Sequence, residues 1–198
     1  LLKRKLNVKK LKVGHAGTLD PLATGLLIVC TGKFTKKINE IQAQVKEYTG
    51  TITLGATTPS YDLETEENNR FDWGNITEKQ VHEAAETFLG ESEQYPPVFS
   101  AKRINGQKAY IKARKGVEVV MLPQKITIEK FEIEKINLPN VHFKIVCSKG
   151  TYIRTIADDF GKRLHNGAHL SVLCRTGIGD YQLSDAFKIE TLQELLEE

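Results

Sequence analysis

Alternating apolar and polar side chains predict that this chain is built around β-strands. Residues 46–54 combine β-branched and aromatic side chains and end at Gly55, which is typical of a strand. Residues 126–136 and 141–147 alternate in the same way, so we expect them to pair as two strands joined by a turn. A continuous apolar run over residues 26–30 is typical of a short buried strand.

Two other segments have the spacing of helices. Thr77 is followed three residues later by Gln80, the pattern of a capping box, and we expect the helix that starts there to end at Gly90. Residues 153–165 carry apolar side chains at helical spacing, with Gly167 beyond the end. Strands and helices therefore mix without a regular βαβ rhythm. We expect an α+β fold with a mixed, mainly antiparallel sheet.

Length and composition place only broad limits on function. The 198 residues, 40% hydrophobic and 27% charged, are ordinary for a globular protein, and we expect residues 1–198 to form a single domain. No apolar run approaches the roughly 20 residues that span a bilayer, which argues against a membrane protein. Cys30, Cys147 and Cys174 are far apart and odd in number, which favours a reducing cytoplasm over a disulfide framework. Because the sequence starts at Leu1, we expect that an N-terminal segment is missing.

Charge is distributed unevenly along the chain. Residues 1–50 contain ten Lys and Arg against three acids, residues 61–94 contain ten acids against two bases, and residues 95–117 contain six bases and no acid. Two basic stretches separated by an acidic one suggest a positive face that would suit nucleic acid. A solvated surface without a partner explains the same pattern, so charge alone leaves both interpretations open.

One loop carries the strongest candidate for chemistry. Asp20 is flanked by Gly14, Gly17, Pro21 and Gly25, residues that shape a backbone and allow another chain or a ligand to approach closely. An Asp before Pro is most often a turn former with no chemical role. The glycines on both sides and the apolar run that follows favour instead a carboxylate held on a rigid base.

A second segment supplies a partner for this carboxylate. Residues 147–155 predict a strand end, a Gly turn and the start of a helix, which places Arg154 in the first helical turn. A helix N-terminus prefers anions, so an Arg there is either an ordinary surface residue or one committed to a carboxylate, for which Asp20 is the obvious candidate. That pairing would keep Asp20 ionised, which suits a nucleophile or a general base. The sequence has no metal-ligand spacing, P-loop or dinucleotide fingerprint, so neither a metal nor a nucleotide cofactor is expected.

Four motifs follow one another along the chain. They are GHAGTLDPLATG around Asp20, KEY at residues 46–48, FSAK at residues 99–102, and SKGTYIRT followed by Asp158 and Asp159. In this order, over about residues 13–178, the chain resembles the bacterial tRNA pseudouridine-55 synthases, the TruB family. The resemblance implies a pseudouridine-synthase fold, with helices flanking the sheet around a central RNA-binding cleft. It also implies isomerisation of the T-loop uridine at position 55 of tRNA to pseudouridine, by base flipping and an aspartate-dependent break of the N-glycosidic bond, without a cofactor.

The resemblance also implies roles for individual residues. Asp20 would be the essential aspartate, Arg154 its salt-bridge partner, and Tyr48 the residue that stacks on the base and takes the C5 proton. The other matches would contact the substrate: His15 against the flipped nucleotides, Asp62 at a polar position, and Tyr152 and Leu173 as walls of the uridine pocket. Residues 99–116 match a basic insertion that clasps RNA, with expected contacts from Lys102, Arg103 and Lys108.

The sequence departs from the family pattern in three places. The N-terminal Lys-Pro motif is absent, Pro59 stands where a polar residue is usual before Asp62, and the chain ends soon after Leu192. We therefore expect the C-terminal PUA-like RNA-binding module to be absent or truncated. The expected partner is the T-arm stem-loop of tRNA, and the expected assembly is a monomer.

Two other functions stay open from the residues. A non-catalytic RNA-binding or RNA-chaperone protein would use the same basic cleft, although it would have no need of a buried carboxylate facing anionic RNA. Asp20 and Thr24 also have the D-x-x-x-T spacing of a phosphoryl-accepting aspartate. That chemistry would need further acidic residues to hold Mg²⁺.

Overall fold

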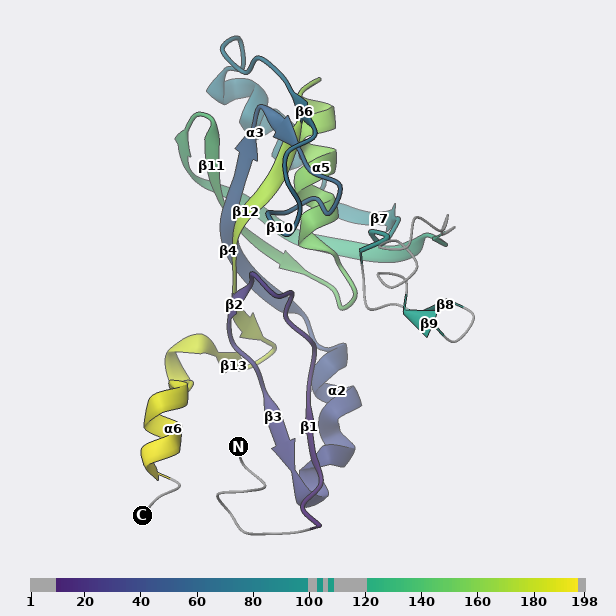
Figure 1. Ribbon diagram of the computed structural model, residues 1–198, viewed down its shortest axis with the longest axis vertical. Helices are drawn as coiled ribbons and strands as arrows, with labels where there is room; N and C mark the ends of the chain where they lie inside the picture. Colours follow the sequence, from purple (N-terminus) through teal and green to yellow (C-terminus); the bar gives the residue numbers. More distant parts are fainter. Residues whose placement is uncertain (1–9, 100–102, 105–106, 109–120, 196–198) are drawn as a thin grey trace.

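A central β-sheet of seven strands organises the molecule (Figure 1). The computed structural model describes residues 10–99, 103–104, 107–108 and 121–195. The strands of the sheet span Thr24–Gly25 (β2), Lys46–Leu54 (β4), Gly90–Gln94 (β7), Gln124–Asn137 (β10), Asn140–Cys147 (β11), Ala168–Ile178 (β12) and Tyr181–Gln182 (β13). They lie in the order β13–β12–β4–β11–β10–β7, with β2 beside β12. Only the β2–β12 pair is parallel, so the expected α+β class with a mixed, mainly antiparallel sheet is confirmed.

The three long strands predicted from alternation are confirmed. β4 has the predicted bounds, and β10 and β11 form the predicted hairpin, in which Asn137 pairs with Asn140. The sequence pattern does not reveal β12, although this strand lies beside β4 in the middle of the sheet. The register between β12 and β4 shifts between Leu170 and Val172, and again between Arg175 and Gly177. Each shift breaks the strict alternation by which a strand is recognised.

Two helices pack against one face of the sheet (Figure 1): α3 (Glu78–Glu86) and α5 (Ile153–Arg163). The predicted capping box of α3 is present, because the Gln80 backbone N–H donates to the Thr77 hydroxyl at 3.3 Å and the Thr77 N–H donates to the Gln80 side chain at 2.9 Å. The predicted end at Gly90 is wrong. The helix ends at Glu86, and Gly90, with a φ of 92°, begins β7 instead.

Aromatic side chains fill the space between these helices and the sheet. Neighbouring rings meet with centroids 5.7 to 6.3 Å apart, in the set Phe88, Phe131, Phe143 and Phe160. Each fully buried side chain of this kind contributes about 1.5–3 kcal/mol. Because the helices are fixed to the sheet in this way, the start of α5 is also fixed relative to β4 and β12.

A smaller unit lies beyond one end of the sheet (Figure 1). It contains β1 (Val13–His15), β3 (Val29–Thr31), the 3-10 helix η1 (Gly32–Lys37) and α2 (Ile38–Ala43). Its core joins Ala16, Leu26, Cys30 and Ile41 to Ile178 of β12. The buried strand predicted over residues 26–30 is wrong in its bounds and in its burial, since Leu27 and Val29 are 45% and 43% exposed. The physical reason is that β1 and β3 form a two-stranded ribbon, which buries only one side.

Short elements complete the described part of the chain. They are β5 (Ala56–Thr57), β6 (Asn69–Arg70), β8 (Arg103–Ile104), β9 (Gln107–Lys108), the 3-10 helix η2 (Leu183–Asp185) and α6 (Ile189–Leu195). Within the residues that the structure describes, no helix is both long and apolar enough to cross a membrane. Most of the predicted insertion at residues 99–116 lies outside the described residues.

Candidate active site

The loop between β1 and β2 carries Asp20 and is attached to its surroundings on both sides. The Ala16 N–H donates to the Ile28 carbonyl at 2.9 Å, and the Leu26 N–H donates to the Arg175 carbonyl at 2.8 Å. Gly25 has a φ of 103°, and a Cβ there would lie 2.3 Å from the Arg175 carbonyl oxygen. Glycine is therefore required where the loop meets β12. The loop is a rigid support for Asp20.

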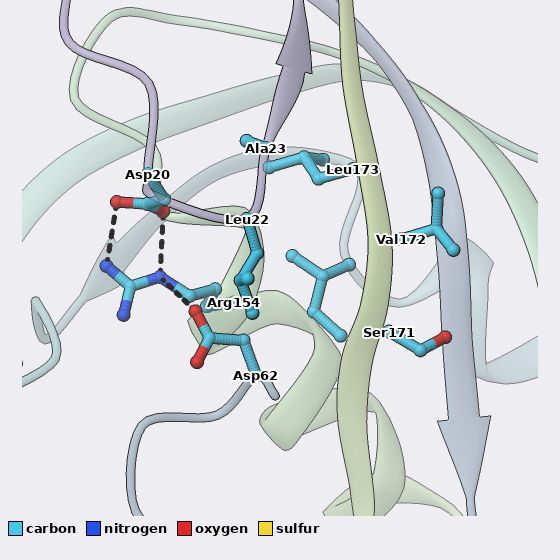
Figure 2. A pocket seen from close by; sticks show the side chains of 9 residues that line it. Asp20, Leu22, Ala23, Asp62, Arg154, Ser171, Val172 and Leu173 are labelled. Carbon is cyan, nitrogen blue, oxygen red and sulfur yellow. Dashed lines mark hydrogen bonds and ion pairs between the residues drawn. The ribbon is translucent and has the colours of Figure 1, made fainter. Parts of the chain in front are cut away.

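Asp20 and Arg154 form a bidentate ion pair (Figure 2). Arg154 Nε donates to Asp20 Oδ2 at 2.8 Å, and Arg154 Nη2 donates to Asp20 Oδ1 at 3.0 Å. The pairing expected from the sequence is thus present. The Arg154 side chain is 3% exposed and the Asp20 side chain 37%. The guanidinium is therefore buried behind a carboxylate that stays accessible, and the two-bond geometry fixes the orientation of that carboxylate.

The same guanidinium contacts a second carboxylate and the backbone. Asp62 Oδ2 lies 3.5 Å from Arg154 Nε (Figure 2), and Arg154 also donates to the Ser60 and Phe99 carbonyls at 3.2 Å. Asp62 is 4% exposed, and its Oδ1 accepts a hydrogen bond from the Glu64 backbone N–H at 3.0 Å. Two carboxylates therefore share one cation. The hydrogen bonds offset the cost of removing these charges from water.

A cleft of about 770 Å³ opens in front of Asp20. Tyr48 on β4, Leu173 on β12 and Tyr152 at the start of α5 line it together with Asp20. Four segments that are distant in sequence thus bring four of the sequence-predicted residues to one place. Asp62 lies in an adjoining small hollow, which Asp20, Arg154 and Leu173 also line (Figure 2).

The other sequence-predicted residues do not line this cleft, or they lie outside the residues that the structure describes. His15 is exposed on β1 and does not line the cleft. The backbone of Arg103 in β8 pairs with that of Lys108 in β9, and Lys102 lies outside the described residues. Their contacts with RNA therefore stay predictions.

Burial sets the protonation state of Tyr48. It raises the pKa of Tyr48 to about 12, because the phenolate would lose its hydration. The positive charge of the nearby Arg175 guanidinium favours the phenolate and acts in the opposite direction, but its effect is smaller. Near neutral pH, Tyr48 is therefore a neutral phenol on the wall of the cleft.

Four basic residues that line the cleft have no role assigned from the sequence: Lys46, Lys125, Lys149 and Arg175. Two of them, Arg175 and Lys46, are buried. Arg175 is 2% exposed, and it is among the largest fully buried side chains of the described chain. Burial lowers the pKa of Lys46, whose Nζ donates to the Gln42 and Gln44 carbonyls at 2.5 Å. One sequence feature could have indicated Arg175: it is a lone Arg in residues 168–178, a segment that contains no Lys, Asp or Glu.

The arrangement supplies a fixed carboxylate, a buried guanidinium and a phenol. Such a set offers a nucleophile or base, a positive charge that orients it, and an aromatic face. Among the described residues, no group of three or more His, Cys, Asp or Glu side chains is arranged to hold a metal ion.

Comparison with known sequences identifies similar proteins over nearly the whole chain. The model of the family described as "TruB family pseudouridylate synthase (N terminal domain)" matches residues 3–153. The tRNA pseudouridine synthase B of Flavobacterium johnsoniae is 56% identical over 189 residues, which cover 96% of this chain and 82% of that protein. The tRNA pseudouridine synthase B of Phocaeicola vulgatus is 51% identical over 195 residues, which cover 98% of this chain and 83% of that protein.

Two solved complexes contain chains with a similar fold. A Cbf5–Nop10–Gar1 complex contains a chain that matches with a TM-score of 0.68 at 27% identity, over 91% of this chain and 44% of that chain. An H/ACA ribonucleoprotein bound to a substrate RNA that contains 2′-deoxyuridine matches with a TM-score of 0.66 at 25% identity, over 99% of this chain and 46% of that chain. This chain therefore spans less than half of each of these longer chains.

Proposed function

The chain belongs to the TruB family of pseudouridylate synthases, and we propose on this basis that it converts the T-loop uridine at position 55 of tRNA to pseudouridine. The names of its relatives support tRNA as the substrate. The observation in the structure that carries the proposal is the bidentate Asp20–Arg154 pair at the edge of a large cleft. The proposal includes no cofactor.

The reaction is an isomerisation in which atoms are only rearranged. The bond between N1 of uracil and C1′ of ribose breaks, the uracil turns, and C5 bonds to C1′. The C5 proton is lost and N1 gains one. In our proposal Asp20 is the group on which the bond break depends, as a nucleophile or a base. Arg154 holds both Asp20 oxygens by hydrogen bonds, so the carboxylate keeps one orientation toward the cleft.

The target base must leave its stack before it can enter the cleft. Extruding a base costs a few kcal/mol, and stacking on an aromatic side chain returns about 1–3 kcal/mol. Tyr48 is the side chain assigned to this stacking, with Tyr152 and Leu173 as further walls of the pocket. The three line one cleft with Asp20, which supports the assignment.

The neutral state of Tyr48 limits how it can take the C5 proton. With a pKa of about 12, roughly one phenol in 10⁵ is ionised at pH 7. Tyr48 therefore accepts the C5 proton only while it passes its own proton to another acceptor. Asp20 is a carboxylate that lines the same cleft as Tyr48, so it is the acceptor that we propose.

The remaining residues are assigned to RNA contact. Positive side chains of the insertion would neutralise phosphates of the T-arm, which makes affinity depend on salt. The residues that we assign to RNA contact are His15, Asp62, Lys102, Arg103 and Lys108.

A T-arm stem-loop RNA tests the proposal directly. After incubation with the protein, nucleoside analysis should detect pseudouridine, and mapping should place it at the position equivalent to 55. A stem-loop with cytidine at that position is the matched control and should give none. Tight binding without conversion would contradict the proposal and favour the non-catalytic RNA-binding protein. Conversion at a different uridine would contradict the assignment of position 55.

A further inference from the structure

Arg175 lies between Tyr48 and the loop that carries Asp20. It stands opposite Tyr48 in the register of β12 with β4, and beside Gly25 in the register of β12 with β2. Residues directly opposite on neighbouring strands share one face of a sheet. The side chains of Arg175 and Tyr48 therefore lie together on the face that borders the cleft, and both line it.

The guanidinium of Arg175 holds the Asp20 loop at two points. Its Nε donates to the Leu26 carbonyl at 2.8 Å, and its Nη2 donates to the Gly17 carbonyl at 3.1 Å. One contact is three residues before Asp20 and the other six residues after it. The positive charge of the same guanidinium also acts on the neighbouring Tyr48 hydroxyl, where it favours the phenolate and so acts to lower the pKa of Tyr48.

Packing alone does not explain why a charged side chain is buried at position 175. Arg175 is 2% exposed, and in the part of the chain that the structure describes no carboxylate forms an ion pair with it. A buried charge that is compensated by carbonyl dipoles alone is expensive, and an apolar side chain of similar volume is often as stable or more so. The charge therefore needs a reason other than stability.

We propose that Arg175 is a positioning residue whose guanidinium holds the Asp20 loop beside the Tyr48 hydroxyl and so fixes the carboxylate relative to the phenol. This inference rests on the proposed function. A guanidinium only donates hydrogen bonds, so toward Arg175 the Tyr48 oxygen can act only as an acceptor. The Tyr48 O–H then points away from Arg175, where its proton can be passed on as the C5 proton is taken.

Arg175→Lys is the first test, since it keeps the charge and cannot reach both carbonyls and the phenol at once. Arg175→Met leaves no charge to bury and serves if the lysine variant does not fold. The matched control is Arg163→Lys, because Arg163 also donates to a carbonyl, that of Thr87 at 3.2 Å, but at the far end of α5. We expect the single-turnover rate on the T-arm stem-loop to fall about 100-fold for Arg175→Lys, with RNA affinity unchanged within about threefold. The control should keep the wild-type rate.

A double-mutant cycle separates positioning from general damage. If Arg175 acts through the Tyr48 hydroxyl, Arg175→Lys should cost clearly less in a Tyr48→Phe background than in the wild type. Equal losses in both backgrounds, or a wild-type rate for Arg175→Lys and Arg175→Met, would overturn the inference.

Hydrogen exchange gives a readout that does not need activity. Amides of residues 16–26 should exchange faster in Arg175→Lys, while amides of β10 and β11 keep their protection. Unchanged exchange in the loop would overturn the inference even if the enzyme is active. A wild-type protein that converts no uridine would instead refute the proposed function, and the exchange result would still decide whether Arg175 holds the loop.

Discussion

Replacing Arg154 by lysine tests the ion pair without removing its charge. Arg154 makes two hydrogen bonds to Asp20, at 2.8 and 3.0 Å, and contacts Asp62 at 3.5 Å. A lysine ammonium is a point charge and cannot reproduce the two parallel bonds of a guanidinium. We expect Arg154→Lys to keep one of the two bonds to Asp20 and to lose the fixed orientation of the carboxylate.

The size of the effect follows from the bonds that are lost. A hydrogen bond to a charged group is worth about 1.5–3 kcal/mol. If that contribution is lost from the transition state, the rate falls roughly 10- to 150-fold. Arg154→Met should behave differently, because it leaves the buried Asp62 carboxylate unpaired. We expect it to lower the free energy of unfolding by about 3–5 kcal/mol as well.

The assay is single-turnover conversion of the T-arm stem-loop with enzyme in excess, alongside RNA affinity and urea unfolding for each variant. Arg163→Lys is the matched control, since Arg163 stacks 3.9 Å from the Phe88 ring, away from Asp20. A wild-type rate for a folded Arg154→Lys protein would refute the reasoning that bidentate geometry matters. An equal loss in Arg163→Lys would show that the substitution acts through general damage.

Three further predictions concern pH, helix capping and salt. Burial raises the pKa values of Tyr48 and Cys147 to about 12, from ordinary values of 10.0 and 9.0. The folded protein therefore keeps protons that the unfolded chain loses, so stability should be complete below about pH 9 and decrease from there toward pH 12. Urea unfolding at pH 8 and pH 10.5 measures this, and a Tyr48→Phe/Cys147→Ala variant with the same pH dependence as wild type would contradict it. Thr77→Ala removes the capping box of α3 and should lower the free energy of unfolding by about 1 kcal/mol, whereas an unchanged urea midpoint would show that the cap contributes nothing. Neutralising Lys102, Arg103 and Lys108 of the insertion should flatten the dependence of RNA affinity on salt. An unchanged slope would show that these side chains do not contact phosphates.

Local patterns predict those elements of the fold whose sequence signal is uninterrupted. β4, the β10–β11 hairpin and the capping box of α3 follow from alternation, turn residues and a short motif. β12 does not, because two register shifts interrupt its alternation and its partners are distant in sequence. The apolar run at residues 26–30 gives a clear strand signal but a wrong prediction of burial. Its apolar character suits a buried strand, but the ribbon that it enters covers only one side.

The residues of the site also divide into those that the sequence predicts and those that it does not. The glycines around Asp20 and the position of Arg154 at a helix start predict their pairing, since each residue conflicts with an ordinary structural role. Arg175 and Lys46 are missed because their partners are backbone carbonyls, which leave no mark in the sequence. The Phe99 and Ser60 carbonyls that Arg154 reaches are hidden for the same reason.

Tritium release from C5-labelled uridine in the T-arm stem-loop tests most directly the central claim that isomerisation depends on Asp20. Asp20→Asn keeps the shape of the side chain and removes its charge. Asp159→Asn is the matched control, because Asp159 is a 42%-exposed carboxylate that pairs with Lys162 on α5. We predict release by the wild type and by Asp159→Asn, and none above background by Asp20→Asn, which should still bind the RNA. Release by Asp20→Asn at the wild-type rate would contradict the claim.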